Sequence, residues 1–281
     1  MNGKTVIITG ANSGIGLEAA VGIAKLGGHV VMACRNATKA DAARADVVAR
    51  SGNTTVEVLP LDLASFASIR KFAATALERF EHIDVLLNNA GVVMRSRQDT
   101  TDGFETTFGV NHLGHFLLTN LLTDRIVATP AARIITVASD AHKFAGKGLD
   151  FDDLQATNRY RAFGAYGKSK LANILFTREL ARRLNESGVT ANCVHPGFVA
   201  SNFGRADTLG NIAMILGRPF AISAERGAVT SVFLATDTSV ATTTGQYFYK
   251  SAVREPNANG RDDAVAARLW TVSEELVASK S

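Results

Sequence analysis

The chain has 281 residues, of which 46% are hydrophobic and 20% are charged, and its net charge is +4. Enough apolar residues are present to form a sizeable core, which excludes an intrinsically disordered protein. The small positive excess is spread among acidic residues, so we expect no nucleic-acid partner. No apolar run reaches the roughly 18–20 residues that span a bilayer. Because strand-like Thr5–Thr9 lies so near the N-terminus, we expect no signal peptide, no membrane anchor and a cytoplasmic location.

Short β-branched runs alternate with helix-length segments along the chain. The sequence predicts seven strands, at Thr5–Thr9, His29–Ala33, Thr55–Leu59, Val85–Asn88, Ile134–Ser139, Thr190–His195 and Gln246–Tyr249. It predicts helices over Ile15–Lys25, Lys39–Arg50, Ser65–Phe80, Phe104–Ala128, Ala165–Asn185 and Glu225–Ala235. The strands are nearly continuous apolar runs, as expected where helices cover both faces of a sheet. The pattern predicts an α/β fold with a doubly wound parallel sheet, and we expect residues 1–281 to form a single domain.

Distinctive residues follow six of the predicted strands. They are Gly10–Gly16, Arg35, Asp62, Asn88–Gly91, Ser139 and Pro196–Gly197. In parallel α/β sheets, ligands bind beyond the carboxyl ends of the strands. The six strand ends therefore predict one binding crevice.

The glycines at positions 10, 14 and 16 lie between the first strand and the first helix. Glycines permit a tight turn and a close approach of the backbone to phosphate, and the helix N-terminus supplies N–H groups and a positive dipole. The spacing differs from the Gly-x-Gly-x-x-Gly of most dinucleotide-binding folds, and a bare glycine pattern can be an ordinary turn. Its place between strand and helix favours a pyrophosphate site.

Arg35 follows the second predicted strand, where an NAD-binding enzyme carries an acid for the ribose 2′-hydroxyl. No acidic residue occurs from Val30 to Asn36. A guanidinium at this point can bind the 2′-phosphate of NADP. The alternative is a solvated surface arginine, and we favour NADP(H) as the cofactor.

Tyr166 and Lys170 are four residues apart on a predicted helix, so their side chains share a face. A free tyrosine has a pKa of about 10, and a nearby ammonium would lower it enough for acid/base catalysis. Ser139 could hydrogen bond a substrate oxygen, although a serine at a strand end is common. Asn111 lies within a predicted helix, where asparagine is mildly unfavourable, which suggests a role.

The histidines and cysteines do not indicate a metal site. His112, His115, His142 and His195 lack the spacing of a ligand cluster, so we expect no metal. Cys34 and Cys193 fall in strands that the usual strand order separates by four ladder steps, which at about 4.8 Å per step is roughly 19 Å. A disulfide needs Cα atoms within about 7 Å, so both thiols should be free.

These motifs together resemble the short-chain dehydrogenase/reductase family, whose domain is a Rossmann-type sheet. The markers are Thr9-Gly10-x-x-x-Gly14-x-Gly16, Asn88-Asn89-Ala90-Gly91, Asn111, Ser139, Tyr166-x-x-x-Lys170 and Pro196-Gly197. Further segments, such as Asn111-His112-Leu113-Gly114-His115-Phe116 and Arg268–Ser273, resemble the retinol-dehydrogenase-like branch of the family.

The resemblance implies a role for each matching residue. Tyr166 would be the acid/base, Lys170 would lower its pKa and bind the nicotinamide ribose, and Ser139 would orient the reacting oxygen. Asn111 would hold a water that links Lys170 to solvent. Cofactor contacts are expected from Gly10, Asn12, Ser13, Gly14, Ile15, Gly16, Arg35, Asp62, Leu63, Asn89, Ala90, Gly91, Tyr166, Lys170, Pro196, Gly197 and Val199.

We therefore expect an NADP(H)-dependent oxidoreductase that interconverts an alcohol and a carbonyl compound. The apolar residues of the segment 198–222 predict a lid and a small hydrophobic alcohol, ketone or aldehyde as substrate. A non-catalytic dinucleotide-sensing regulator and a non-redox epimerase or dehydratase are the alternatives. The wide apolar faces of Phe104–Ala128 and Ala165–Asn185 suggest a homo-oligomer, a dimer or tetramer, unless the 140–165 insert covers them.

Overall fold

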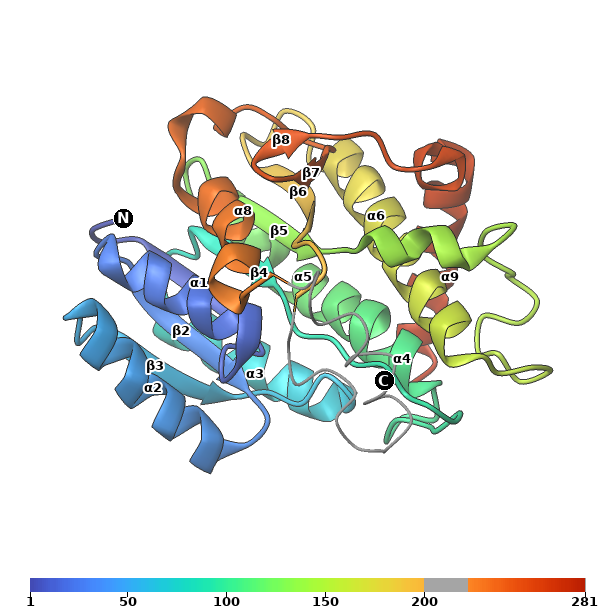
Figure 1. Cartoon of the computed structure of the whole chain (residues 1–281), viewed down its shortest axis with the longest axis horizontal. Coiled ribbons are helices and arrows are strands. Elements are labelled where there is room, and N and C mark those ends of the chain that lie inside the picture. Colours follow the sequence, from blue (N-terminus) through green and yellow to red (C-terminus); the bar gives the residue numbers. More distant parts are fainter. Residues whose placement is uncertain (200–221, 281) are drawn as a thin grey trace.

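A computed structural model describes residues 1–199 and 222–280, and within these ranges eight strands form one sheet (Figure 1). The strand order is β3-β2-β1-β4-β5-β6-β7-β8. All neighbouring strands are parallel except β7 and β8, which are antiparallel. The bounds are β1 Thr5–Thr9, β2 His29–Cys34, β3 Val56–Pro60, β4 Val85–Asn88, β5 Arg133–Val137, β6 Thr190–His195, β7 Tyr247–Tyr249 and β8 Ala252–Val253. The predicted doubly wound sheet is confirmed, and β8 is an additional edge strand.

Helices cover both faces of the sheet (Figure 1). Alternate side chains of a strand point to opposite faces, so Val6 and Ile8 of β1 belong to one core cluster and Ile7 belongs to the other. The first face carries α1 (Gly14–Lys25), α2 (Ala37–Ser51) and α8 (Ala224–Thr236). The second face carries α3 (Phe66–Arg79), α5 (Gly114–Val127), α6 (Ala162–Arg183) and α9 (Asp263–Ala278). None of these helices is long and apolar enough to cross a membrane.

The helix α9 was not predicted from the sequence. Its Trp270 stacks on Phe176 of α6 at 5.8 Å between ring centroids and meets Phe116 of α5 edge-on at 5.0 Å. The Arg183 guanidinium covers the Trp270 ring at 4.3 Å, and the indole N–H donates to Glu274 at 2.7 Å. The apolar surplus of the two long helices, from which we expected an oligomer, is therefore covered in part by α9.

The predicted helix over Phe104–Ala128 is confirmed as one continuous helical run from Thr106 to Val127, but it contains a π-helical turn that the sequence did not predict. The segment begins with the short helix α4 (Thr106–Phe108), continues as the π-helical turn η1 (Gly109–Leu113) and only then becomes α5. The Glu105 carboxylate accepts from the N–H groups of Thr107 and Phe108 and so caps α4. A Cβ on Gly114 would lie 2.7 Å from the Leu63 carbonyl oxygen, so the chain packs closely just after η1. Asn111 lies at the centre of this π-turn.

The sequence predicted that Ser139 ends the fifth strand, but the structure places it just after that strand. β5 stops at Val137, and Ser139 is the N-cap of the 3₁₀ helix η2 (Asp140–Ala145). Its hydroxyl accepts from the Ala141 N–H at 3.1 Å. Serine is a preferred N-cap because its side chain satisfies a free N–H of the first turn, so Ser139 begins η2 two residues after the end of β5.

Most of the predicted lid, residues 200–221, lies outside the described residues. The two flanking residues, Val199 and Ile222, form a parallel β-bridge, and the Ile222 N–H donates to the Phe198 carbonyl at 2.8 Å. The bridge brings the ends of this segment together beside Pro196–Gly197.

Candidate active site

The glycine-rich turn links β1 to α1, and its backbone and close contacts favour glycine. Gly10 and Gly14 have φ angles of +66° and +57°, in the left-handed region. A Cβ on Gly16 would lie 2.5 Å from both the Gly10 oxygen and the Asn89 Nδ2. Ser13 is the N-cap of α1, and among the described residues its side chain caps no N–H of the first turn. The first N–H groups of α1 can therefore receive an anion.

Thr9 fixes this turn to the end of β4. Its hydroxyl accepts from the N–H groups of Asn89 and Ala90, each at 2.9 Å, and the Asn89 amide donates to the Thr9 carbonyl at 2.8 Å. A Cβ on Gly10 would lie 3.0 Å from that of Ala90. The predicted residues Gly10, Asn89 and Ala90 thus form one floor. Thr9 itself was quoted only as a marker and was missed as the residue that joins them.

The ends of β2 and β3 border the same crevice. Arg35 follows β2, is exposed and makes no hydrogen bond or ion pair within residues 1–199 and 222–280. Asp62 follows β3, and its carboxylate accepts from the Ala64 N–H at 3.0 Å. Leu63 is buried against Gly114 at the start of α5. Arg35 therefore remains available for an anionic ligand, whereas Asp62 shapes its own turn.

The end of β6 meets the glycine-rich turn through α8. A Cβ on Gly227 would lie 2.7 Å from Val199 Cγ2, 3.3 Å from Ile15 Cγ1 and 3.6 Å from the Pro196 oxygen. Gly197 has a φ angle of +93°. The structure thus brings Ile15, Pro196 and Val199 together around one glycine.

Tyr166 and Ser139 meet at the mouth of the crevice. Burial raises the pKa of the Tyr166 phenol to about 12, and a hydrogen bond with the Ser139 side chain opposes that rise. The Lys170 Nζ lies 5.6 Å from the centre of the Tyr166 ring. Burial has the larger effect on this pKa, and the position of the Lys170 Nζ over the ring leaves the predicted influence of the lysine on the tyrosine as a prediction.

Lys170 is buried, and its Nζ donates to the Val137 carbonyl at 2.8 Å. Burial lowers its pKa to about 7. A Cβ on Gly91 would lie 3.5 Å from this Nζ and 3.4 Å from the Asn111 Oδ1. The segment after β4 therefore lies against both the Lys170 ammonium and the Asn111 amide. This contact links the predicted cofactor floor to the predicted catalytic residues.

Asn111 connects the π-turn to two other elements. Its amide accepts from the Val92 N–H at 2.8 Å and donates to the Val92 carbonyl at 2.9 Å. It also donates to the Ser169 hydroxyl at 3.0 Å, and Ser169 precedes Lys170 on α6. A π-turn is frequent at functional sites, and here it directs the amide toward these partners.

Two histidines form hydrogen bonds that hold the loops around Ser139. The His142 Nδ1 donates to the Ser139 carbonyl at 2.7 Å, and its Nε2 accepts from the Asn257 N–H at 3.2 Å. The His195 Nδ1 accepts from the N–H groups of Asp140 and Gly197, each at 3.3 Å. Burial lowers the pKa of His195 to about 4. Among the described residues no group of three His, Cys, Asp or Glu side chains is placed to hold a metal ion.

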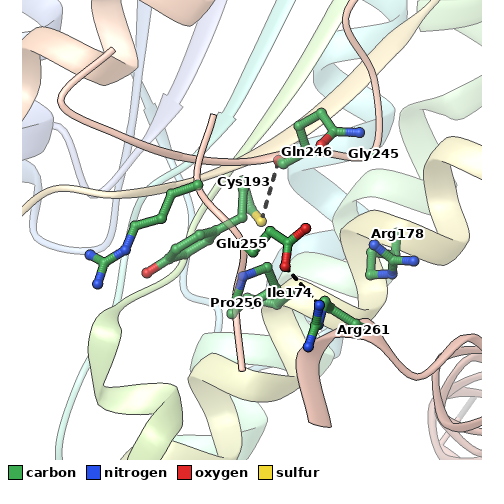
Figure 2. A pocket seen from close by; sticks show the side chains of 10 residues that line it. Ile174, Arg178, Cys193, Gly245, Gln246, Glu255, Pro256 and Arg261 are labelled. Atoms are coloured by element: carbon green, nitrogen blue, oxygen red, sulfur yellow. Dashed lines mark hydrogen bonds and ion pairs between the residues drawn. The ribbon is translucent and has the colours of Figure 1, made fainter. Parts of the chain in front are cut away.

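A second pocket lies between α6 and the strands β6 to β8 (Figure 2). Its arginines are paired, Arg261 with Glu255 at 2.7 Å and Arg178 with Asp263 at 2.8 Å. The Cys193 thiol faces the Gln246 carbonyl at 3.7 Å. Cys193 and Cys34 are both free, as predicted, and lie on strands separated by β1, β4 and β5. No predicted site residue lines this pocket.

Comparison with known proteins identifies the family. The family model for short chain dehydrogenases matches residues 4–151 and 153–210, so the chain belongs to the short-chain dehydrogenase/reductase family. It is 46% identical to retinol dehydrogenase 13 of Homo sapiens over 286 residues, which cover 98% of this chain and 85% of that protein. Within the family it is therefore retinol-dehydrogenase-like.

Two solved structures support the same assignment. An uncharacterised protein of Mycobacterium paratuberculosis is 36% identical, with a TM-score of 0.76 and coverage of 98% of this chain and 94% of that one. RhlG of Pseudomonas aeruginosa, solved as an NADP active-site complex, is 25% identical, with a TM-score of 0.71 and coverage of 88% and 94%. The chain is an oxidoreductase that interconverts alcohol and carbonyl groups with a nicotinamide dinucleotide.

Proposed function

We propose that this protein is an NADP(H)-dependent alcohol dehydrogenase or carbonyl reductase in which Tyr166 transfers the proton. The observation that carries the proposal is the meeting of Ser139, Tyr166, Lys170 and Asn111 beside the glycine-rich turn. Three separate segments of the chain contribute these side chains, and a purely structural role would not require this chemistry at one crevice.

The residues present fit a phosphorylated dinucleotide. The glycine-rich turn leaves no room for a Cβ at position 16 and presents the N-terminus of α1 to an anion. Arg35 is exposed beyond β2 and would bind a 2′-phosphate through charge-assisted hydrogen bonds. The NADP in the RhlG complex supports this choice of cofactor. The dinucleotide would supply or accept the hydride.

The protein's own contribution is to hold the substrate oxygen and to move its proton. Because the pKa of Tyr166 is raised, its phenol is protonated at neutral pH and suited to donate to a carbonyl oxygen. Ser139 would orient that oxygen, since its hydroxyl is fixed as the cap of η2 and reaches the phenol. Lys170, held by the Val137 carbonyl, would bind the nicotinamide ribose. The retinol dehydrogenase relatives support a hydrophobic alcohol, ketone or aldehyde as substrate.

A panel of aliphatic and aromatic ketones, aldehydes and alcohols tests the proposal. NADPH absorbance at 340 nm should change steadily with at least one hydrophobic carbonyl compound, and faster than NADH absorbance at equal concentration. A non-catalytic sensor would bind the dinucleotide without consuming it. An epimerase or dehydratase would convert its substrate without net cofactor consumption. Either of those results would reject the proposal.

A further inference from the structure

His115 lies in the first turn of α5 and joins the two halves of the candidate site. Its Nε2 is 2.9 Å from the Thr9 hydroxyl, and its Nδ1 is 3.1 Å from the Asn111 carbonyl oxygen. The side chain is 1% exposed. Thr9 holds the floor of the dinucleotide crevice, whereas Asn111 belongs to the π-turn that borders Lys170. One imidazole therefore contacts both.

The hydrogen-bond partners fix the state of this ring. Burial lowers the pKa of His115 to about 4, so the ring is neutral near pH 7. The Asn111 carbonyl can only accept, so the Nδ1 carries the proton, and the Nε2 must accept the hydroxyl proton of Thr9. The lone pairs of the Thr9 oxygen are then left for the N–H groups of Asn89 and Ala90. The donor and the acceptor of every hydrogen bond in this series therefore follow from the histidine tautomer.

We propose that His115 is a positioning residue for the reaction: its Nε2 holds the dinucleotide floor through Thr9, and its Nδ1 holds the catalytic π-turn through Asn111. The inference rests on the proposed function and assigns His115 a role in it. Its two bonds act on different elements. The Thr9 bond orients the Asn89–Ala90 backbone beneath the glycine-rich turn. The Asn111 bond supports the amide that holds Val92 and Ser169.

Two substitutions separate the two bonds. His115→Asn can place its amide N–H near the former Nδ1 and keep the bond to Asn111, but it does not reach Thr9. His115→Gln can place its amide oxygen near the former Nε2 and keep the bond to Thr9, but it loses the donor to Asn111. Loss of one buried hydrogen-bond partner changes an equilibrium or a rate by about tenfold.

The measurements are the dissociation constant of NADPH, from protein fluorescence without substrate, and kcat at saturating NADPH. His115→Asn should raise the dissociation constant about tenfold and change kcat less than about twofold. His115→Gln should leave the dissociation constant within about twofold and lower kcat about tenfold. Thr9→Val also takes the acceptor from the Asn89 and Ala90 N–H groups, so it should raise the dissociation constant by more than about tenfold, whereas Thr9→Ser keeps the hydroxyl and should not. Because Thr9→Val leaves the Nδ1 bond to Asn111 intact, its kcat should change less than about twofold, and a large loss of kcat would contradict the inference even if a histidine variant fails to fold.

His112 provides a matched control, because it is an equally buried histidine in the π-turn that precedes α5. Its Nε2 bonds the Ser273 hydroxyl of α9 at 2.8 Å, away from the cofactor floor. His112→Asn and His112→Gln should lower the unfolding temperature and alter neither NADPH affinity nor kcat.

If both His115 variants also lower only the unfolding temperature, His115 is an ordinary core histidine. That result would overturn this inference and leave the proposed function standing. If the unmodified protein binds no dinucleotide, the proposed function falls and this inference falls with it.

Discussion

Tyr166 and Lys170 illustrate how burial shapes the chemistry of single residues. Burial raises the pKa of the tyrosine to about 12 and lowers that of the lysine to about 7. Both shifts favour the neutral form, since a charge is poorly solvated there. A protonated phenol is the form that can donate to a carbonyl oxygen, which is the role proposed for Tyr166 in carbonyl reduction.

We predict that Tyr166→Phe lowers kcat by about 10²–10⁴-fold, because general acid–base catalysis typically contributes that much. The ring remains, so the NADPH dissociation constant should be nearly unchanged. Lys170→Ala should lower kcat and also weaken NADPH binding, because the Lys170 ammonium is proposed both to assist Tyr166 and to bind the nicotinamide ribose. Steady-state rates and fluorescence titrations measure the two. A Tyr166→Phe enzyme that retains most of its kcat would rule out the assigned acid/base.

The second prediction concerns Arg35. Arg35→Ala should weaken NADPH binding by about ten- to a hundredfold, because charge-assisted hydrogen bonds contribute about 1.5–3 kcal/mol. NADH binding should barely change, since NADH has no 2′-phosphate. Calorimetric titration of each cofactor measures the difference. Equal binding of both cofactors by the unmodified protein would contradict the preference for NADP(H).

The residue types at the strand ends could be predicted from the sequence, whereas their connections could not. The apolar pattern predicts the strands that precede Gly10–Gly16, Arg35 and Asp62. The links made by His115 and His195 depend on segments that lie about a hundred or about fifty positions apart in the chain. A histidine in an apolar run carries no signal of such partners, so the sequence predicted neither link.

At the level of elements, the glycine-rich turn shows how close packing creates a binding surface. We predict that Gly16→Ala lowers NADPH affinity by tenfold or more, about 1.4 kcal/mol. Its Cβ would lie 2.5 Å from the Gly10 backbone oxygen, so the turn must move. Gly164→Ala on α6 is the control, because its Cβ would meet only Arg161 at an ordinary 3.6 Å. Equal affinities of the two variants would show that the turn tolerates displacement.

The π-helical turn between α4 and α5 is the part of this helical run that the sequence could not predict. The apolar pattern from Phe104 onward continues without interruption, so periodicity alone cannot mark a π-turn. The cause is tertiary: Gly109 packs against Thr100 and Gly114 against Leu63, with Cβ positions that would lie 2.7 Å from each neighbour. The sequence indicated only that Asn111 was poorly suited to a regular helix.

At the level of the whole molecule, α9 covers apolar surface that the sequence left unassigned. We predict that Trp270→Ala lowers the free energy of unfolding by about 3–5 kcal/mol, the usual cost of removing a large buried aromatic side chain. It should also promote self-association, since Phe116 and Phe176 lose their cover. Urea unfolding and light scattering test both effects. A variant as stable as the unmodified protein would show that α9 contributes little.

The buried histidines predict acid sensitivity of the fold. Burial lowers the pKa of His112 to about 3 and those of His115 and His195 to about 4, below the ordinary 6.5. Between pH 6.5 and about 4 the unfolded chain binds protons that the folded chain does not, so the free energy of unfolding falls as the pH falls. Each histidine contributes up to about 1.4 kcal/mol per pH unit in this window.

Urea unfolding at several pH values measures how the free energy of unfolding changes with pH. A single histidine substitution provides the control. His112→Asn removes one titrating ring and should reduce the slope by about a third of the contribution of the three. A slope that is unaffected by this substitution would mean that the ring is already charged in the folded protein.

The bridge between Val199 and Ile222 has a consequence for how this protein could diversify. Because the two ends of the intervening stretch are clamped together beside the sheet, changes in its length need not be transmitted to β6 or α8. Sequence changes between the two bridged residues can therefore leave the end of β6 and the start of α8 in place, so the cofactor crevice would keep its shape while the chain varies at this point.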